Sequence, residues 1–219
     1  MSAIELRAVS KGYRGRRVID ELSLRVAAGE RLVLTGPSGC GKSTLLHLIA
    51  GLATPDSGDI LIDGVLVASA KRNLREPEER GIGMVFQDLA LWPHMTVADN
   101  IEFGLRARRL PRTDRRQRVR DMVNLVKLGD YLNAKPGELS GGEQQRVALA
   151  RALAQWPAIV LMDEPLSSLD EELKAQMRRE ILRLHGELRF TLVYVTHSRE
   201  EANELGTRTV ALASAASRA

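Results

Sequence analysis

The sequence lacks cysteine pairs, long apolar runs and a signal-peptide core. Its single cysteine, Cys40, excludes a fold held together by disulfides within the chain. No apolar run approaches the ~20 residues that span a bilayer, and residues 1–15 carry no apolar core of the kind that directs secretion. These absences predict a protein that works in the cytosol or on the cytosolic face of a larger assembly.

The sequence also has few aromatic residues and a small net charge. Aromatic residues make up 4% of the 219 residues, and 32 lysines and arginines against 28 acidic residues leave a net charge of +4. So small a charge does not by itself indicate nucleic-acid binding. The chain does have apolar residues, 44%, which excludes a disordered chain and is enough for one domain, or one domain with an inserted subdomain.

Segments with strand-like and helical spacing alternate along the chain. Strands are expected at 3–9, 22–26, 31–35, 82–86, 158–162 and 190–196, with one more in the tail, and helices at 42–50, 141–155 and 171–188. A hairpin is expected over 59–67 around Asp63-Gly64. The alternation predicts a mostly parallel sheet flanked by helices. We expect 1–213 to form a single domain and 214–219 to be a frayed tail.

A charged helical stretch interrupts the alternation from Thr96 onward. Pro111 separates two helical segments, and the stretch predicts a helical subdomain over about 96–155, inserted into an α/β core. Eight arginines lie between Arg106 and Arg120. We interpret them as a solvated helix face, with RNA or an acidic membrane surface as the alternative. Because the block has no aromatic residues for base stacking, no nucleic-acid partner is expected.

A glycine-rich loop between the strand at 31–35 and the helix at 42–50 matches G-x-x-x-x-G-K-[ST] in full. Its backbone N–H groups and the positive end of the following helix predict a site for the phosphates of ATP. Lys42 is expected to reach the β- and γ-phosphates, and the Ser43 hydroxyl to ligate Mg²⁺. The loop residues expected to contact the nucleotide are Gly36, Pro37, Ser38, Gly39, Cys40, Gly41, Lys42, Ser43 and Thr44.

Cys40 allows two interpretations within this loop. As a small spacer residue it has no chemical role. Alternatively, the positive potential of the loop lowers the pKa of its thiol and makes it reactive, in which case alkylation would block ATP binding.

Two adjacent carboxylates follow the apolar strand at 158–162. Asp163 and Glu164 fall where the carboxyl ends of parallel strands bind ligands. Two neighbouring negative charges are costly at a buried strand end without a cation, so Asp163 is expected on the Mg²⁺ side. Glu164 is one residue further on and points elsewhere, where it can polarise the attacking water. The pair therefore predicts Mg²⁺-dependent ATP hydrolysis.

A second anion site is indicated at the start of the helix at 141–155. Ser140 is expected as its N-cap, and Gly141 and Gly142 leave bare backbone N–H groups there. One ATP needs one phosphate loop, so the simplest interpretation is that this second site serves an ATP held by another subunit.

The motifs GPSGCGKST, LSGGEQQR, LMDEP, SSLD and VTHS occur in this order. Together they resemble the ATP-binding subunit of an ABC transporter, over roughly residues 3–210. The resemblance implies an α/β fold: a P-loop NTPase core with a mostly parallel sheet, an N-terminal antiparallel β subdomain and an inserted helical subdomain. It also implies a homodimer, or pairing with a second ATPase subunit, in which Ser140, Gly141 and Gly142 of one subunit contact the γ-phosphate held by the other.

The same resemblance implies individual roles. Tyr13 would stack on adenine, Gln87 would touch Mg²⁺ and water and couple to the membrane subunit, and His197 would donate a hydrogen bond to the γ-phosphate. Asp170, in the segment Ser168-Leu169-Asp170, would cross the dimer interface. The implied catalytic residues are Glu164, His197, Lys42 and Gln87, and the implied metal ligands are Ser43, Gln87 and Asp163.

Residues 81–105 and 163–181 resemble importer ATPases of the maltose, polyamine, sulfate and ferric-ion type. This implies a peripheral protein on the cytoplasmic face of the inner or plasma membrane, with integral-membrane permease subunits and an external substrate-binding protein as partners. The segment 88–95 would face the permease. Many such importers continue into a C-terminal β-barrel regulatory domain, for which this chain ends too early, so regulation through that domain is not expected.

Three other functions remain open at this point. A short ATPase of the exporter or lipoprotein-release type would share the same motifs. A soluble ABC ATPase of DNA repair or translation would usually show two cassettes or a long coiled-coil insertion, and the sequence has neither. A phosphotransferase could use the same phosphate loop, but it has no use for LSGGE at a helix start.

Overall fold

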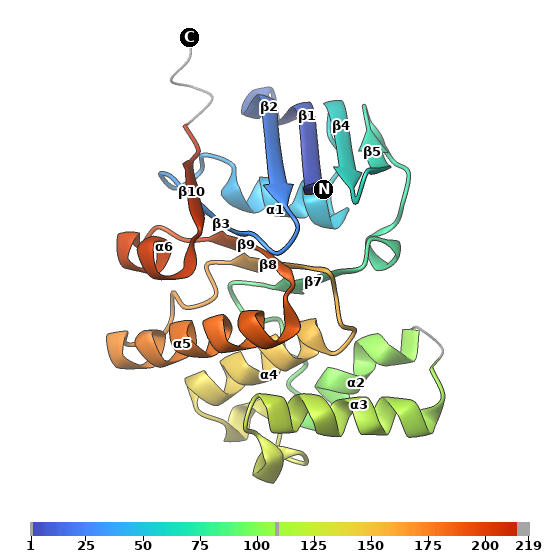
Figure 1. Ribbon diagram of the computed structural model, residues 1–219, viewed down its shortest axis with the longest axis vertical. Coiled ribbons are helices and arrows are strands. Elements are labelled where there is room, and N and C mark those ends of the chain that lie inside the picture. The colour runs from blue at the N-terminus through green and yellow to red at the C-terminus, as the bar shows by residue number, and fades with distance from the viewer. Residues whose placement is uncertain (1, 108–109, 214–219) are drawn as a thin grey trace.

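Two sheets organise the computed structural model, which describes residues 2–107 and 110–213 (Figure 1). The predicted frayed tail at 214–219 lies outside these residues. The first sheet is antiparallel, with strand order β2-β1-β4-β5-β6, and the second has the order β10-β3-β9-β8-β7, with every pairing parallel. The α/β fold class expected from the sequence is therefore confirmed, whereas the boundaries of the single domain and its helical subdomain stay predictions.

The antiparallel sheet is built mainly from two hairpins. Its strands are β1 (Ser2–Tyr13), β2 (Arg16–Ala27), β4 (Ser57–Ile62), β5 (Val65–Ser69) and β6 (Arg72–Asn73). The hairpin between β4 and β5 turns at Asp63 and Gly64, both with positive φ, as predicted from this dipeptide. Strand β2 is longer than the segment 22–26 because register shifts against β1 break the alternation of its first half.

The parallel sheet supplies the buried strands. They are β3 (Arg31–Thr35), β7 (Ile82–Val85), β8 (Ile159–Asp163), β9 (Thr191–Val195) and β10 (Arg208–Ala211). Every residue of β8 and β9 is buried, which explains why these two strands read as unbroken apolar runs. Helix α1 (Lys42–Ala50) follows β3, and α5 (Glu171–Leu188) begins shortly after β8; both bounds match the prediction. Helix α6 (Arg199–Leu205) was not predicted.

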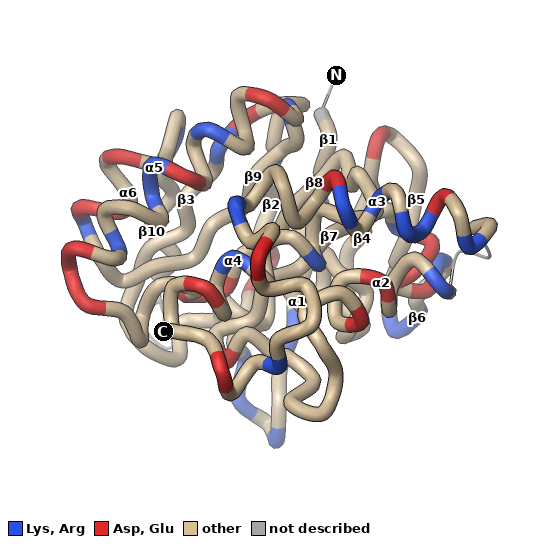
Figure 2. Tube along the Cα trace, turned by 90° about the horizontal axis from the view of Figure 1, so that it is seen from below, with Lys and Arg blue, Asp and Glu red and all other residues tan. Residues whose placement is uncertain are grey.

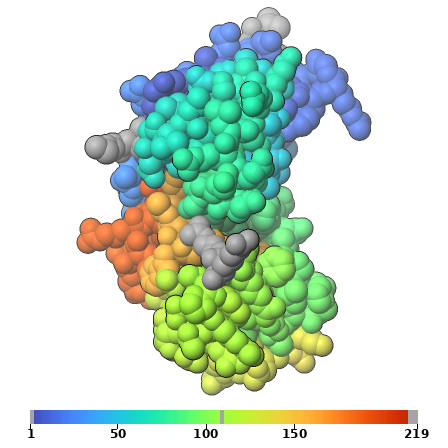
Figure 3. Space-filling model, turned by 90° about the vertical axis from the view of Figure 1, so that its right-hand side faces the viewer, coloured from blue at the N-terminus to red at the C-terminus, as the bar shows by residue number. Residues whose placement is uncertain are grey.

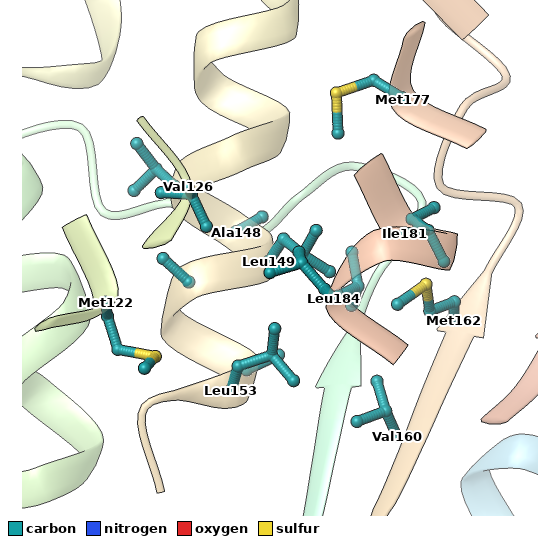
Figure 4. Packing of buried hydrophobic residues seen from close by; sticks show 14 of the residues in the cluster. Met122, Val126, Ala148, Leu149, Leu153, Val160, Met162, Met177, Ile181 and Leu184 are labelled. Atoms are coloured by element: carbon teal, nitrogen blue, oxygen red, sulfur yellow. The ribbon is translucent and has the colours of Figure 1, made fainter. Parts of the chain in front are cut away.

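The remaining helices gather at the end of the molecule away from the antiparallel sheet (Figures 1 and 3). They are α2 (Val97–Ala107), α3 (Arg112–Leu125) and α4 (Gly141–Leu153), and Pro111 precedes α3 as expected. Side chains of α3, α4 and α5 pack with β8 into a common apolar core (Figure 4). A second apolar cluster fills the space between the two sheets around α1. No helix among the described residues is both long enough and apolar enough to cross a bilayer.

Several arginines of the 106–120 block have partners within the chain. Arg106 bridges Asp99 and Glu102, and Arg115 pairs with Glu102. Figure 2 shows acidic residues interspersed with basic ones along α3. This pairing agrees with a solvated, salt-bridged helix surface, although Arg108 and Arg109 lie outside the described residues.

One buried arginine joins α1 to the antiparallel sheet. The guanidinium of Arg80 donates to the carbonyls of Leu48 and Ile49 at the end of α1, both at 2.9 Å. It also donates to two further backbone carbonyls and to the side-chain oxygen of Asn73, so that all five of its N–H groups are engaged. Burial lowers the pKa of this guanidinium, and the fold holds it through these acceptors.

We expect Arg80→Met to cost about 3 kcal/mol or more of folding stability, because it leaves buried carbonyls without donors. Thermal unfolding checks this, with Arg75→Met as the matched control, since the Arg75 side chain is exposed and only its carbonyl meets Arg80. Equal melting temperatures for the two variants would show that solvent replaces the arginine without cost.

Candidate nucleotide-binding site

The glycine-rich loop connects β3 to α1 and is left-handed at three glycines. Gly36, Gly39 and Gly41 have φ values of 144°, 76° and 104°, which other residues rarely adopt. Pro37, Ser38 and Gly39 form the exposed tip, while Thr44 is half-buried in the first turn of α1. The loop thus curls so that the N-terminus of α1 opens onto its concave side.

Lys42 lies beneath this loop and is 6% exposed. Its ammonium donates to the carbonyls of Gly36 at 2.9 Å and Pro37 at 3.2 Å, and it lies 4.0 Å from a carboxylate oxygen of Glu164. A buried ammonium bound mainly to neutral carbonyls keeps its positive charge available to an anion held by the loop.

The cysteine of the loop faces away from its exposed tip. Cys40 is buried and lines a cavity of about 270 Å³ between β2 and β10. A Cβ added at Gly36 would lie 2.8 Å from its sulfur, so the thiol is packed against the loop backbone. This placement favours the spacer interpretation, and we expect thiol reagents to reach Cys40 slowly.

Asp163 ends β8 directly beside the start of α1. Its carboxylate accepts a hydrogen bond from the Ser43 hydroxyl at 3.1 Å. The side chain is buried, which raises its pKa, while the hydrogen bond from Ser43 acts in the opposite direction. A hydroxyl and a carboxylate are hard oxygen donors of the kind that Mg²⁺ takes beside phosphates, so the two residues fit that ion. Within the described ranges, no group of three or more His, Cys, Asp or Glu side chains is placed to hold a metal ion.

Asp163→Asn is expected to raise the melting temperature of the nucleotide-free protein at neutral pH, because it removes a buried charge and keeps an acceptor for Ser43. An acid whose folded pKa is raised stabilises the fold below its ordinary pKa, here 3.8, and that contribution disappears as pH rises through the folded pKa. The advantage of the variant should therefore be absent in acid and grow with pH, by about 2–4 °C for each kcal/mol.

The pH series is measured by thermal unfolding. Asp88→Asn, which changes an exposed carboxylate in the same way, is the matched control. A variant less stable than the wild type at neutral pH would show that the Asp163 carboxylate stabilises the nucleotide-free fold.

Glu164, the residue after Asp163, contacts a histidine that follows the neighbouring strand β9. Its backbone is left-handed, with φ of 41°, and its N–H donates to the Val195 carbonyl at 3.0 Å. Its carboxylate lies 3.0 Å from Nδ1 of His197, within hydrogen-bond distance. The His197 ring is 69% exposed. Strained backbone of this kind is concentrated at functional sites.

Tyr13 and Gln87 come at the carboxyl ends of two further strands, β1 and β7. Tyr13 ends β1 with its ring exposed, and the Lys11 ammonium lies 5.2 Å from the ring centroid. Gln87 follows β7 and is exposed. Among the described residues neither side chain makes a hydrogen bond to the glycine-rich loop. The roles of both residues in nucleotide binding stay predictions.

The start of α4 is capped from both directions. Ser140 Oγ accepts from the Glu143 backbone N–H, and the Glu143 carboxylate accepts from the Ser140 backbone N–H at 2.8 Å. The Ser140 hydroxyl also donates to this carboxylate at 2.8 Å, and the two hydrogen bonds that the carboxylate accepts from Ser140 hold the pKa of Glu143 below its usual value. The motif-based reading missed this role of Glu143, although a serine followed three residues later by glutamate is a known capping signature.

One of the two glycines at this helix start lies against α5. A Cβ at Gly142 would lie 2.8 Å from Leu173 Cδ1, so the Leu173 side chain would have to shift to admit any other residue there. Gly141 stays exposed beside the N-cap. Asp170 caps α5 by accepting from the Leu173 N–H at 2.9 Å.

The two helices whose starts are expected to bind anions, α1 and α4, lie on opposite sides of the parallel sheet. Helix α1 lies on the side that faces the antiparallel sheet, and α4 lies on the other (Figure 1). Among the described residues no hydrogen bond or ion pair links the segment 140–143 with the glycine-rich loop. The two expected sites are therefore separate within one chain.

Comparisons with known proteins agree with this geometry. Residues 19–167 match the family model described as ABC transporter, so the chain belongs to the ABC transporter family, as an ATP-binding domain. The resemblance drawn from the motifs is thereby confirmed.

Individual members of the family are similar to this chain over most of its length. The chain is 47% identical over 213 residues to the sn-glycerol-3-phosphate import ATP-binding protein UgpC of Pectobacterium atrosepticum, and 48% identical to that of Bordetella pertussis. Each match covers 97% of this chain, which spans 58% of the length of these relatives. Among solved structures, the ATP-binding cassette MJ0796, dimeric and bound to ADP and Pi, matches with a TM-score of 0.83 and 34% identity, covering 95% of this chain and 94% of that one.

Proposed function

We propose that this chain binds ATP together with Mg²⁺, hydrolyses it, and drives solute import as the ATP-binding subunit of a membrane transporter. The observation that carries the proposal is the convergence of Lys42, Ser43, Asp163, Glu164 and His197 at the carboxyl ends of β3, β8 and β9. The carboxyl ends of parallel strands are where open α/β sheets bind ligands.

Each residue of this cluster has a place in hydrolysis. The loop N–H groups and Lys42 bind the β- and γ-phosphates, and Tyr13 supports the adenine. Ser43, Asp163 and Gln87 would hold Mg²⁺, which neutralises charge on the phosphates. Glu164 orients a water and takes its proton as the water oxygen bonds to the γ-phosphorus and the bond to the ADP oxygen breaks. His197 contacts Glu164 through Nδ1 and would donate a hydrogen bond from Nε2 to the γ-phosphate, as an imidazolium with N–H on both ring nitrogens.

Dimerisation completes the site. The exposed N-terminus of α4, with Ser140 and Gly141, can bind an anion, but it is separate from the glycine-rich loop of the same chain. In a head-to-tail homodimer it closes over the γ-phosphate held by the partner copy, with Asp170 beside the interface. ATP then bridges the two copies, and its hydrolysis removes the bridge, so that the difference in affinity between ATP and ADP opens and closes the dimer.

The proposed partners are integral-membrane permease subunits, reached through the segment 88–95, and an external substrate-binding protein. This places the chain peripherally on the cytoplasmic face of the membrane. The curated relatives at 47–48% identity are import ATP-binding proteins, which supports the direction of transport. The transported solute is set by the permease and the binding protein and not by this chain.

A pull-down tests the proposal. Tagged Glu164→Gln protein is incubated with ATP and gently solubilised membranes, and captured proteins are identified by mass spectrometry. Lys42→Ala, which should not bind ATP, is the matched control. Recovery of a multi-spanning permease in the ATP-dependent fraction supports transport, whereas recovery of only the bait, or of ribosomal or DNA-repair proteins, would favour a soluble ABC ATPase.

A further inference from the structure

The segment that follows β7 has no regular secondary structure, yet it is closely held. Gln87 lies within a turn closed by the Leu89 N–H donating to the Phe86 carbonyl at 3.0 Å. Leu89, the last residue of this turn, and Ala90 after it are left-handed, with φ of 59° and 46°. Left-handed backbone at two consecutive non-glycine residues is strained and persists only where neighbouring groups hold it.

Helix α2 holds the far end of this segment. The buried side chain of Asn100 accepts from the Trp92 N–H at 2.9 Å and donates to the carbonyls of Trp92, Met95 and Thr96. These bonds hold residues 92–96. They do not reach the turn that contains Gln87, so other groups must hold that turn.

Helix α4 holds the near end through one arginine. The Arg151 guanidinium donates through Nη2 to the Leu89 carbonyl at 2.6 Å and through Nη1 to the carbonyl of Ala90. It also lies over the Trp92 ring, 5.1 Å from the centroid, and that ring packs on Phe103 with centroids 4.2 Å apart. Arg151 thus contacts the two left-handed residues, Leu89 and Ala90. It also contacts Trp92, the first residue that Asn100 holds.

The partners of Arg151 are backbone and ring rather than a carboxylate. Among the described residues no ion pair includes it, and burial lowers the pKa of its guanidinium. A cation placed in this way is costly unless its fork of N–H groups is satisfied in a fixed geometry. Its contacts therefore specify the shape of the turn.

We infer that Arg151 is a positioning residue for Gln87. It connects the helix that begins at Ser140–Gly142 to the turn that carries Gln87, so that the position of α4 sets the position of the glutamine side chain. The inference rests on the proposed ATP hydrolysis and assigns this coupling to one guanidinium.

Kinetics test the inference on the full chain. Arg151→Met should lower kcat for ATP hydrolysis by about 10- to 100-fold, since a displacement of about 1 Å in a positioned group can cost up to about 10²-fold. KM for ATP should stay within about twofold, because the glycine-rich loop still binds the nucleotide. In a Gln87→Ala background, Arg151→Met should add no further loss, because both changes remove the same interaction.

The chain offers a matched control for these variants. Arg118 lies over Trp156 with its guanidinium carbon 5.2 Å from the ring centroid, the same kind of contact at another place on the helical end. Arg118→Met should leave kcat and KM unchanged. Losses of Arg151→Met and Gln87→Ala that multiply in the double variant would overturn the inference, because they would show a general structural effect.

Fluorescence follows the turn itself without nucleotide. The sequence has two tryptophans, so Trp156→Phe leaves Trp92 as the single reporter. In that background Arg151→Met should lower the fluorescence anisotropy of Trp92, as the ring loses the guanidinium and the turn gains motion. Unchanged anisotropy would overturn the inference even if the variant were less stable, and so would lowered anisotropy with unchanged kcat.

The two proposals fail in different ways. A wild-type chain that binds no ATP or hydrolyses none would contradict the proposed function, whatever Trp92 reports. A wild-type chain with normal hydrolysis whose rate survives Arg151→Met would contradict only the inference about Arg151.

Discussion

Glu164→Gln is expected to bind ATP and to lose hydrolysis by about 10²- to 10⁴-fold, the range that a general base contributes. In the wild type the Glu164 carboxylate lies 3.0 Å from Nδ1 of His197. The amide keeps the shape of the side chain, and its oxygen can still accept a hydrogen bond from the histidine ring. It cannot take a proton from water. Because the ATP then stays uncleaved, the protein should accumulate as an ATP-bound dimer, seen by phosphate release together with gel filtration.

The matched control is Glu78→Gln, an exposed glutamate in the short turn Pro77–Glu79. It should hydrolyse ATP at the wild-type rate and form no ATP-dependent dimer beyond that of the wild type. If Glu164→Gln hydrolysed ATP normally, another group would have to activate the water, and the pairing of Glu164 with His197 would be purely structural.

Lys42→Ala is expected to lose ATP binding by at least about 30-fold, which corresponds to the 2 kcal/mol or more that truncating one partner of a buried charge pair costs. The ammonium already lies under the loop, bound to the carbonyls of Gly36 and Pro37, so its charge is in place before any phosphate arrives. Titration with a fluorescent ATP analogue measures the loss.

Two comparisons separate lost charge from lost folding. Lys71→Ala removes an exposed lysine from the turn before β6 and should bind the analogue normally. The melting temperature of Lys42→Ala should stay well above the temperature of the titration. Normal binding by folded Lys42→Ala protein would contradict the placement of the phosphates in this loop.

The sequence alone was sufficient where the determinants are local. The glycines and Lys42 of the loop, the strand before it and the helix after it are contiguous, so their spacing fixed both the motif and the bounds of α1. The bounds of α5 were also predictable from contiguous residues, because its N-cap Asp170 precedes a long segment with helical spacing of apolar residues. The turn at Asp63-Gly64 was predictable from that dipeptide alone. The order of five motifs then identified the family and, with it, the α/β fold.

The tertiary structure decided what depends on residues far apart in the chain. The 3.0 Å contact between Glu164 and His197 exists because β8 and β9 are neighbours in the sheet. The contact of Gly142 with Leu173 depends on how α4 packs on α5. Helix α6 was missed because a seven-residue segment carries too little periodicity to be recognised.

The roles of Arg80 and Arg151 also could not be predicted from the sequence. Both look like ordinary charged residues there, because a guanidinium bound to backbone carbonyls leaves no pattern in residue types. Local spacing thus determined the chemistry that this protein carries, since phosphate loops and helix starts are built from contiguous backbone. Only the packed sheets and helices determined which side chains meet, because those contacts follow from strand order and burial.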